Sequence, residues 1–392
     1  GPIGPRMKFQ GKEVIFWSAN DYLGLCNHPE VLEADAKAAA EYGMFYPMGA
    51  RAMSGETEQH LQLERELADF VGKESAYLLN FGYQGMVSTI DALVSRHDVI
   101  VYDSNSHACI VDGVRLHMGK SFMFRHNDMD SFEKNIKRAT KVAEENGGGI
   151  LVITEGVFGM TGQQGKLKEI AEFKKQYSFR LLVDDAHGFG TLGKTGAGAG
   201  EEQGCQDQID VYFSTFAKSM AGFGAFIAGN KEIIRYLKFN LRSQIFAKSL
   251  TMPMVIGGLK RLELLRTRPE IKAKLWENVE KLQNGLLERG FNLGNSNTCV
   301  TPVFMQGTPV EATLLVKDLR ENFGIFTSVV VYPVIPKGSI LLRLIPTASH
   351  TDAEINETLA AFEAIHDKLV NGVYKQQAEK LLEEQNLSFK PL

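Results

Sequence analysis

The sequence has few cysteines, little tryptophan and no long apolar run. Its 392 residues include four cysteines and two tryptophans, and no two cysteines form a Cys-x-x-Cys pair. This spacing argues against a disulfide framework or a zinc site, so we expect a reduced, cytoplasmic protein without a metal. No apolar stretch approaches the roughly 20 residues that span a bilayer, so we expect no transmembrane segment. The net charge of −4 argues against the basic surface typical of nucleic-acid-binding proteins.

Strand and helix patterns alternate through the middle of the chain. Helical patterns at 85–94, 129–145 and 167–177 lie between short apolar runs. These runs predict strands at 76–79, 99–103, 150–154, 181–184, 211–215 and 225–228. The alternation is typical of an α/β fold, in which helices cover both faces of a mostly parallel sheet.

The order of these patterns predicts three regions. Residues 1–45 form an N-terminal arm, irregular except for a short strand near 14–16, and a first helix that begins at Pro29. Residues 46–289 form the large domain, which ends in long connecting helices. Residues 290–392 form a small C-terminal α+β domain. Its patterns predict strands near 300–305, 329–332 and 339–344, helices at 311–322 and 352–370, and a charged, partly helical segment at 374–392.

Lys218 is the central candidate residue. The predicted strand 211–215 leads into the turn Phe216-Ala-Lys218-Ser-Met-Ala-Gly-Phe-Gly224, which is rich in small residues and flanked by apolar ones. Removal from water lowers the pKa of an ammonium group and frees the amine to attack a carbonyl carbon. We therefore interpret Lys218 as a Schiff-base nucleophile.

One motif resembles a nucleotide-binding loop. The stretch 188–195, Gly-Phe-Gly-Thr-Leu-Gly-Lys-Thr, has the letters of a P-loop and follows a predicted strand. A P-loop must open a helix, whose first amides hold the phosphates, and the Gly-Ala-Gly-Ala-Gly that follows is a poor helix start. We expect a glycine-rich surface turn instead.

Polar groups follow several other predicted strands. Asn80-Phe-Gly82-Tyr83-Gln-Gly follows a strand and opens a helix, so its amides could cradle a phosphate, although a tight turn explains the pattern as well. His107 follows another strand end; its imidazole could stack on a flat ring, or it could be a hydrogen-bonded loop residue.

The strand that ends at Asp184 adds two further groups. Asp184 could pair with a protonated ring nitrogen, and His187 could reach a phenolate oxygen. Each residue alone has an equally good structural explanation. Together with Lys218, His107 and the phosphate cradle, they form the set of groups that would bind pyridoxal 5′-phosphate.

Ten short motifs extend this interpretation over nearly the whole chain. They are Asn20-Asp-Tyr-Leu-Gly-Leu, Met48-Gly-Ala-Arg51, Ser106-His107-Ala-Cys-Ile-Val-Asp-Gly, Arg125-His-Asn-Asp-Met129, Thr154-Glu-Gly-Val-Phe158, Val183-Asp-Asp-Ala-His187-Gly, Thr215-Phe-Ala-Lys218, Tyr332-Pro-Val-Ile-Pro336, Leu342-Arg343-Leu and Ser349-His350-Thr. In these motifs the sequence resembles the α-oxoamine synthases, fold-type I enzymes of pyridoxal phosphate. That family includes serine palmitoyltransferase, 2-amino-3-ketobutyrate CoA ligase, 8-amino-7-oxononanoate synthase and 5-aminolevulinate synthase.

The resemblance implies a role for each matching residue. Lys218 would bind the aldehyde of the cofactor and act as acid and base at the substrate Cα. Asp184 would pair with the pyridine nitrogen and His187 with the ring oxygen. His107 would stack on the ring and help to orient the incoming thioester.

The same resemblance assigns the remaining binding residues. The amides of Gly82 and Tyr83 and the hydroxyl of Thr215 would hold the phosphate. Arg343 would bind the carboxylate of the amino acid, a bidentate task suited to a guanidinium group, and Asn20 would assist it.

The chain departs from the family pattern at three places. Gly159 stands where the family usually has serine near the cofactor. Ala247 replaces the serine or threonine that contacts the phosphate of the neighbouring subunit, so Lys248 or Ser249 could supply that contact, or Lys248 could bind an anionic substrate. The loop 42–55 also lacks the usual glycine-rich sequence.

The resemblance implies a decarboxylative Claisen condensation of an amino acid with an acyl-CoA or an acyl carrier protein thioester, in a homodimer with active sites at the interface. A serine-like substrate is favoured, and Lys248 makes cysteate a competitor. Glycine or alanine with a CoA thioester is a further alternative. Outside the family, an aminotransferase of the same fold is the main alternative, whereas a non-catalytic subunit would typically lack Lys218.

Overall fold

The computed structural model describes residues 3–332, 335 and 337–384. The chain divides into two compact units. The large unit comprises Leu25–Gly159 and Gln163–Lys272, and the small unit comprises Gly1–Gly24, Met160–Gly162 and Ala273–Leu392. The three-region division at residues 45 and 289 stays a prediction.

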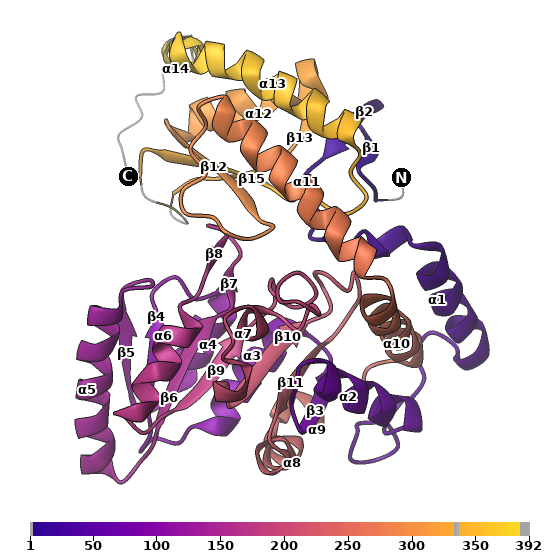
Figure 1. Cartoon of the computed structure of the whole chain (residues 1–392), viewed down its shortest axis with the longest axis vertical. Helices are drawn as coiled ribbons and strands as arrows, with labels where there is room; N and C mark the ends of the chain where they lie inside the picture. Colours follow the sequence, from indigo (N-terminus) through magenta and orange to yellow (C-terminus); the bar gives the residue numbers. More distant parts are fainter. Residues whose placement is uncertain (1–2, 333–334, 336, 385–392) are drawn as a thin grey trace. The chain divides into compact units, whose positions relative to one another are not determined.

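A seven-stranded sheet forms the centre of the large unit (Figure 1). In spatial order its strands are β3 (Ser75–Leu79), β11 (Ala225–Gly229), β10 (Val211–Thr215), β9 (Arg180–Asp184), β6 (Ile150–Glu155), β4 (Val99–Asp103) and β5 (Lys120–Phe124). Only β11 runs antiparallel to its neighbours among these strands. The predicted α/β fold with a mostly parallel sheet is confirmed, and β5 is an additional strand that the sequence patterns did not predict.

Helices pack against both faces of this sheet because the side chains of its central strands are mostly apolar on both faces. On one face, α3 (Gly82–Leu93), α4 (Ala108–Leu116) and α8 (Lys231–Asn240) share a buried core with side chains from six of the strands. On the other, Phe132 of α5 (Met129–Asn146) packs edge-on against Phe124 at the end of β5. The two faces are thus filled with apolar side chains, and polar groups collect where the strands end.

The remaining elements of the large unit surround this sheet. They are η1 (Leu25–Asn27), α1 (Pro29–Tyr42), α2 (Glu58–Phe70), the short hairpin β7 (Val157–Phe158) and β8 (Gln163–Gln164), α6 (Leu167–Glu172), η2 (Phe173–Lys175), α7 (Ala199–Glu202), η3 (Gln206–Gln208), α9 (Arg242–Ile245) and α10 (Met252–Thr267). The predicted start of the first helix is confirmed, since α1 begins at Pro29. Thr57 caps α2 by accepting a hydrogen bond from the amide of His60.

The described residues of the small unit form two three-stranded sheets and four helices. One sheet has the order β1 (Arg6–Phe9), β2 (Lys12–Phe16) and β13 (Ile325–Phe326), and the other β12 (Thr301–Gln306), β15 (Ser339–Leu344) and β14 (Ser328–Val330). The helices are α11 (Pro269–Glu288), which begins in the large unit, α12 (Pro309–Phe323), α13 (Asp352–Val370) and α14 (Val373–Glu384). Trp17, Leu342 and Phe362 lie in their common core.

The prediction of a largely irregular N-terminal arm was wrong. Strands β1 and β2 form an antiparallel hairpin in which Met7 pairs with Val14. Gln10 and Gly11 connect them, and both have positive φ, 49° and 81°. A two-residue turn of this kind matches the twist of paired strands, so it explains why the arm folds back on itself. Residues 385–392 of the predicted C-terminal segment lie outside the described residues.

Within the described ranges, none of the helices is both long enough and apolar enough to cross a membrane.

Candidate active site

Asp184, Thr215 and Lys218, which the sequence singles out, lie at one edge of the large sheet. Asp184 ends β9, Glu155 ends the adjacent strand β6, and Thr215 ends β10 on the other side. Lys218 lies three residues beyond Thr215, in a turn held by a hydrogen bond of 2.9 Å from the amide of Ala221 to the Lys218 carbonyl. In open α/β sheets, ligands bind at this carboxyl edge.

Asp184 is a buried carboxyl group with an elevated pKa. Burial raises the pKa of Asp184 to about 7, and the neighbouring Asp185 acts in the same direction. The amide of Ala186, which donates to Oδ1 at 3.1 Å, and the charge of Lys218 oppose this shift in pKa. Because the ionised form is poorly solvated, Asp184 is suited to a cationic partner such as a protonated ring nitrogen.

His107 is the N-cap residue of α4, and this position determines how its ring is protonated. The amide of Cys109 donates to His107 Nδ1 at 3.3 Å. Burial and the charge of Lys218 lower the pKa of His107. An amide can only donate, so Nδ1 is an acceptor and the neutral ring carries its proton on Nε2.

Glu155 is a residue of this site to which the sequence analysis assigned no role. It is buried, and its Oε1 accepts a hydrogen bond of 2.5 Å from the amide of His107. Burial, with the nearby Asp184, raises the pKa of Glu155 well above its usual value. The signal that could have revealed it is an acid at the end of a largely apolar strand, next to the strand that ends in Asp184.

His187 occupies space that Gly159 leaves open. A Cβ atom built on Gly159 would overlap the imidazole Nε2 of His187, so the ring lies where a side chain at position 159 would begin. The turn that carries His187 is held by the buried carboxyl group of Asp185, which accepts from the amide of Ala199 at 2.9 Å and from the Tyr212 hydroxyl at 3.0 Å. Burial raises the pKa of Asp185 to about 6.

The stretch 188–195 forms turns, as predicted, but its predicted place on the surface was wrong. Its residues are buried except for Lys194 and Thr195. The amide of Gly193 donates to Glu202 at 2.9 Å, and the amide of Thr195 donates to Glu201 at 3.1 Å. The backbone amides that would bind phosphate oxygens in a P-loop therefore donate to carboxylates here.

The start of α3 is a receptive site for a phosphate group. The helix begins at Gly82, and Phe81 before it has no side-chain oxygen to cap the first amides. A Cβ atom at Gly82 would lie 3.1 Å from the Thr215 hydroxyl, so glycine keeps the space in front of that hydroxyl open. The phenolic hydroxyl of Tyr83 donates to Asp112, which directs the ring of Tyr83 along α4.

Lys248 and Ser249 lie next to this helix start. The side-chain amide of Asn80, two residues before Gly82, donates to the carbonyl of Lys248 at 2.5 Å. The Ser249 hydroxyl is buried and has no hydrogen-bond partner in the part of the chain that the structure describes. The Lys248 ammonium instead lies on the 42–55 loop, 3.3 Å from the carbonyl oxygen of Phe45.

These features fit pyridoxal phosphate. The uncapped start of α3 and the open space at Gly82 in front of the Thr215 hydroxyl suit the phosphate group. The elevated pKa of Asp184 suits a cationic ring nitrogen, and Lys218 is an amine at the same edge of the sheet.

The two predicted substrate residues meet in the small unit. Arg343 lies on β15, and its guanidinium group donates to the Asn20 side-chain oxygen at 3.0 Å. Part of the motif 332–336 lies outside the described residues.

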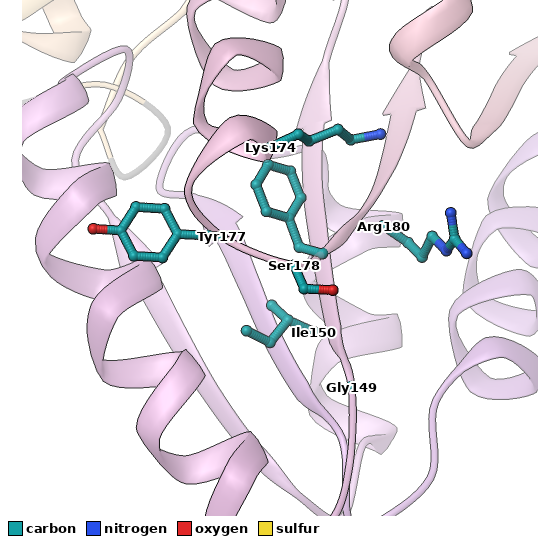
Figure 2. Close-up of a pocket in the computed structure, with 7 residues that line it drawn as sticks. Gly149, Ile150, Lys174, Tyr177, Ser178 and Arg180 are labelled. Carbon is teal, nitrogen blue, oxygen red and sulfur yellow. The ribbon is translucent and has the colours of Figure 1, made fainter.

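A separate pocket of about 380 Å³ opens at the other ends of the same strands (Figure 2). Ile150 and Arg180, the first residues of β6 and β9, line it together with Lys174 and Tyr177. Both of its cations pair with Asp210, at 2.5 Å from Lys174 and 2.9 Å from Arg180. The pocket is therefore distinct from the site at the carboxyl edge.

Comparisons with known proteins extend these observations to the whole chain. A sequence model of the family described as aminotransferase class I and II matches residues 12–362. The chain is 67% identical over 384 residues to a cysteate-C-fatty acyltransferase of Capnocytophaga ochracea, which covers 98% of this chain and 91% of the relative. It is 35% identical to a serine palmitoyltransferase of Sphingobacterium spiritivorum, over 95% of this chain and 90% of the relative.

Solved structures give the same result for the fold. The serine palmitoyltransferase of Sphingomonas wittichii superimposes with a TM-score of 0.87 at 29% identity, over 92% of this chain and 90% of that one. A structure described as serine palmitoyltransferase with a PLP internal aldimine superimposes with a TM-score of 0.88, also at 29% identity, over 94% and 91% of the two chains.

Proposed function

The chain belongs to the α-oxoamine synthase family of pyridoxal phosphate enzymes, and we propose that it condenses cysteate with a fatty acyl thioester, releasing carbon dioxide and a thiol. The observation that carries this proposal is the 67% identity to a cysteate-C-fatty acyltransferase over nearly the full length of both proteins. Identity to serine palmitoyltransferases is about half as high, so the preference moves from serine to cysteate.

The site offers a partner for each part of the cofactor. Pyridoxal phosphate, when bound, supplies an aldehyde for the amino group and a ring that withdraws electrons from the substrate Cα. Lys218 would hold the aldehyde, and Asp184 and His187 would bind the ring nitrogen and the ring oxygen. His107 would cover one face of the ring as a flat, neutral imidazole.

The phosphate would lie at the start of α3. The amides of Gly82 and Tyr83 and the hydroxyl of Thr215 are the groups that would bind it. For the contact with the phosphate of the neighbouring subunit we propose Ser249 rather than Lys248, because the Lys248 ammonium lies on the 42–55 loop. Lys248 is then left as a candidate for the sulfonate of the substrate.

The chain's own groups can move the protons that the condensation requires. The Lys218 amine would take the proton from Cα of cysteate, and a bond would form between this carbon and the thioester carbonyl carbon. The bond from that carbonyl carbon to sulfur would break, and the departing thiolate would take a proton from solvent to leave as the thiol. The Nε2–H of His107 is available as a donor to the carbonyl oxygen during this step.

Decarboxylation would complete the reaction. The bond from Cα to its carboxylate breaks, and Lys218 returns a proton to Cα, leaving a 2-amino-3-oxo sulfonate. Arg343 and Asn20, joined at 3.0 Å, are the groups proposed to hold the carboxylate until it leaves.

The test is to incubate the purified holoenzyme with cysteate and a long-chain acyl thioester. We expect thiol release, carbon dioxide release and an amino-ketone of the summed mass less CO2 and thiol, by mass spectrometry. Lys218→Ala should abolish all three signals. A keto acid without thiol release would instead indicate an aminotransferase, the activity after which the matching family model is described.

We also propose that the enzyme is a homodimer. The large unit exposes several large apolar side chains. Such a group of side chains is typical of a surface that contacts another protein rather than solvent. Within the 42–55 loop and at the predicted phosphate site they are Met44, Phe45, Tyr46, Met48, Met53, Phe81, Tyr83 and Phe246. Light scattering at micromolar concentration should give twice the mass of one chain, and a monomer would contradict the proposal.

A cytoplasmic location is supported by the cysteines. All four are free thiols, and three of them are buried. Proteins of oxidising compartments would more often pair such residues. Cell fractionation, with a cytoplasmic marker enzyme as the reference, tests this assignment.

A further inference from the structure

Cys109 lies between two of the residues proposed to bind the cofactor. Its sulfur is 3.0 Å from His107 Nδ1 and 3.9 Å from Asp184 Oδ2. The residue is buried, with 3% of its surface exposed, and it sits in the first turn of α4. The thiol is therefore in contact with the group proposed to stack on the ring and with the group proposed to pair with its nitrogen.

The hydrogen bonds around Cys109 restrict what its thiol can do. The Cys109 amide already donates to His107 Nδ1, so this nitrogen is an acceptor whichever way the thiol points. A thiol has one proton, which can be directed to Nδ1 or to Asp184 but not to both. Burial raises the pKa of the Cys109 thiol far above its usual value, so the group remains a donor and is not a thiolate nucleophile.

We propose that Cys109 is a positioning residue that couples the protonation of Asp184 to the orientation of His107. When the thiol proton points to Asp184, it stabilises the carboxylate that would face the ring nitrogen. When it points to Nδ1, it reinforces the tautomer that leaves the proton on Nε2. This inference rests on the proposed function, because the cofactor is the group on which both residues act.

The reach of sulfur explains why cysteine suits this position. The carbon–sulfur bond is longer than a carbon–oxygen bond, and the contact with Asp184 is already long at 3.9 Å. A serine hydroxyl would remain close to Nδ1 but would lie farther from the carboxylate. Alanine would lose both contacts. Cys109→Ser should therefore keep the contact with His107 and weaken the contact with Asp184, whereas Cys109→Ala should remove both contacts.

The experiment compares the holoenzyme of these two variants with wild type and with Cys205→Ala. Cys205 is a matched control because it is also 3% exposed and lies in the large unit, where Lys73 and Asp207 rather than Asp184 influence its pKa. Two readouts that do not require turnover are the dissociation constant of pyridoxal phosphate and the pH midpoint at which the visible absorption of the bound cofactor changes.

We expect Cys109→Ala to weaken cofactor binding about three- to tenfold and to move the pH midpoint upward by about half a unit, as for loss of a weak donor to a carboxylate. Cys109→Ser should fall between Cys109→Ala and wild type. Cys205→Ala should match wild type in both readouts. Thermal unfolding checks that the variants fold. If Cys109→Ala does not fold, the comparison of Cys109→Ser with wild type tests the inference.

Two results would overturn the inference. One is a Cys109→Ala enzyme with the affinity and pH midpoint of wild type. The other is an equal change in Cys205→Ala, which would indicate a general effect of core cavities. A wild-type protein that binds no cofactor would instead contradict the proposed function itself.

Discussion

Glu155 and Asp184 are paired residues at the ends of two adjacent parallel strands, and both carboxyl groups are buried. Paired residues of neighbouring strands point to the same face of a sheet, so the two acids share one poorly solvated environment. Burial makes the ionised form of each acid poorly solvated, and a charge on Asp184 repels one on Glu155. The pKa values of both acids are therefore raised. Glu155 is thereby suited to remain a neutral acid that holds the amide of His107.

Glu155→Gln and Glu155→Ala test this role. Glutamine keeps a neutral acceptor for the His107 amide, so we expect kcat/KM within about threefold of wild type at pH 7. Alanine leaves that amide without its partner, and we expect a loss of about 10- to 100-fold, equivalent to one or two hydrogen bonds to a buried group. Steady-state kinetics with cysteate measures both. If glutamine is as damaging as alanine, Glu155 acts as an anion and the account of its neutral state is wrong.

Asp184 should make the cofactor-free protein less stable as the pH rises. Its pKa is about 7 in the folded chain and near 3.8 when unfolded, so between these values the folded state holds a proton that the unfolded state has lost. Stability must therefore fall as pH rises from about 4 to 7, by an amount on the order of a few kcal/mol. Asp184→Asn cannot ionise, and its amide oxygen can still accept from Ala186.

Urea unfolding of both cofactor-free proteins at pH 5 and pH 8 gives the comparison. We expect wild type to lose more stability between these pH values than Asp184→Asn, although the variant should bind pyridoxal phosphate far more weakly. Equal losses in the two proteins would show that Asp184 does not titrate in this range.

Gly159 should tolerate a side chain poorly, because the His187 ring fills the adjacent space. Gly159→Ser would force the imidazole to move, and we expect cofactor affinity to fall about tenfold through the displaced ring contact. Gly149→Ala is the matched control, since a Cβ atom there would make an ordinary contact of 3.5 Å with Asp98. Fluorescence titration with pyridoxal phosphate measures both. Unchanged affinity in Gly159→Ser would mean that His187 has room that the structure does not provide.

Arg51 anchors the 42–55 loop through a buried ion pair. Its guanidinium group binds both carboxylate oxygens of Glu64, at 2.6 and 3.1 Å, and the loop in turn accepts a hydrogen bond from the Ser249 amide at Gly49. Arg51→Met leaves Glu64 buried without its partner, so we expect a loss of about 3–5 kcal/mol in the free energy of unfolding. The exposed pair of Lys141 and Glu145 is the control.

Lys141→Ala should change the unfolding free energy by less than about 0.5 kcal/mol, because solvent screens that pair. Denaturant unfolding of the holoenzymes measures both variants. A small effect of Arg51→Met would show that the loop is held by its other contacts.

The sequence predicted the sheet well because its central parallel strands are mostly apolar runs that end in a polar residue, as β4, β6, β9 and β10 do. Strands at 99–103 and 211–215 were placed to the residue, and β9 to within one. Strand β5 was missed because Lys120-Ser-Phe-Met-Phe has a charged start and exposed positions, as an edge strand often does. The N-terminal hairpin was missed because the Gln10–Gly11 turn lacks the usual Asn-Gly or Asp-Gly signature.

The site was predictable in part for a similar reason. Asp184, Thr215 and Lys218 follow directly from strand ends, since parallel strands bring their carboxyl ends to one edge. The roles of Glu155 and Cys109 were not predicted, because their contacts depend on strand pairing and on the first turn of α4. The sequence pattern alone does not give either of these. The effect of Gly159 on His187 also required coordinates, because a glycine in the sequence does not show which neighbouring side chain fills the space that it leaves.

The most direct test of the central claim is a competition between cysteate and serine in one reaction. Equal concentrations of the two amino acids, one carrying a 13C label, are mixed with a limiting acyl thioester and the holoenzyme, and both amino-ketones are quantified by mass spectrometry. We expect at least about tenfold more sulfonate product than serine product, the ratio that about 1.4 kcal/mol of transition-state discrimination provides. Equal amounts, or an excess of the serine product, would contradict the assignment of cysteate as the substrate.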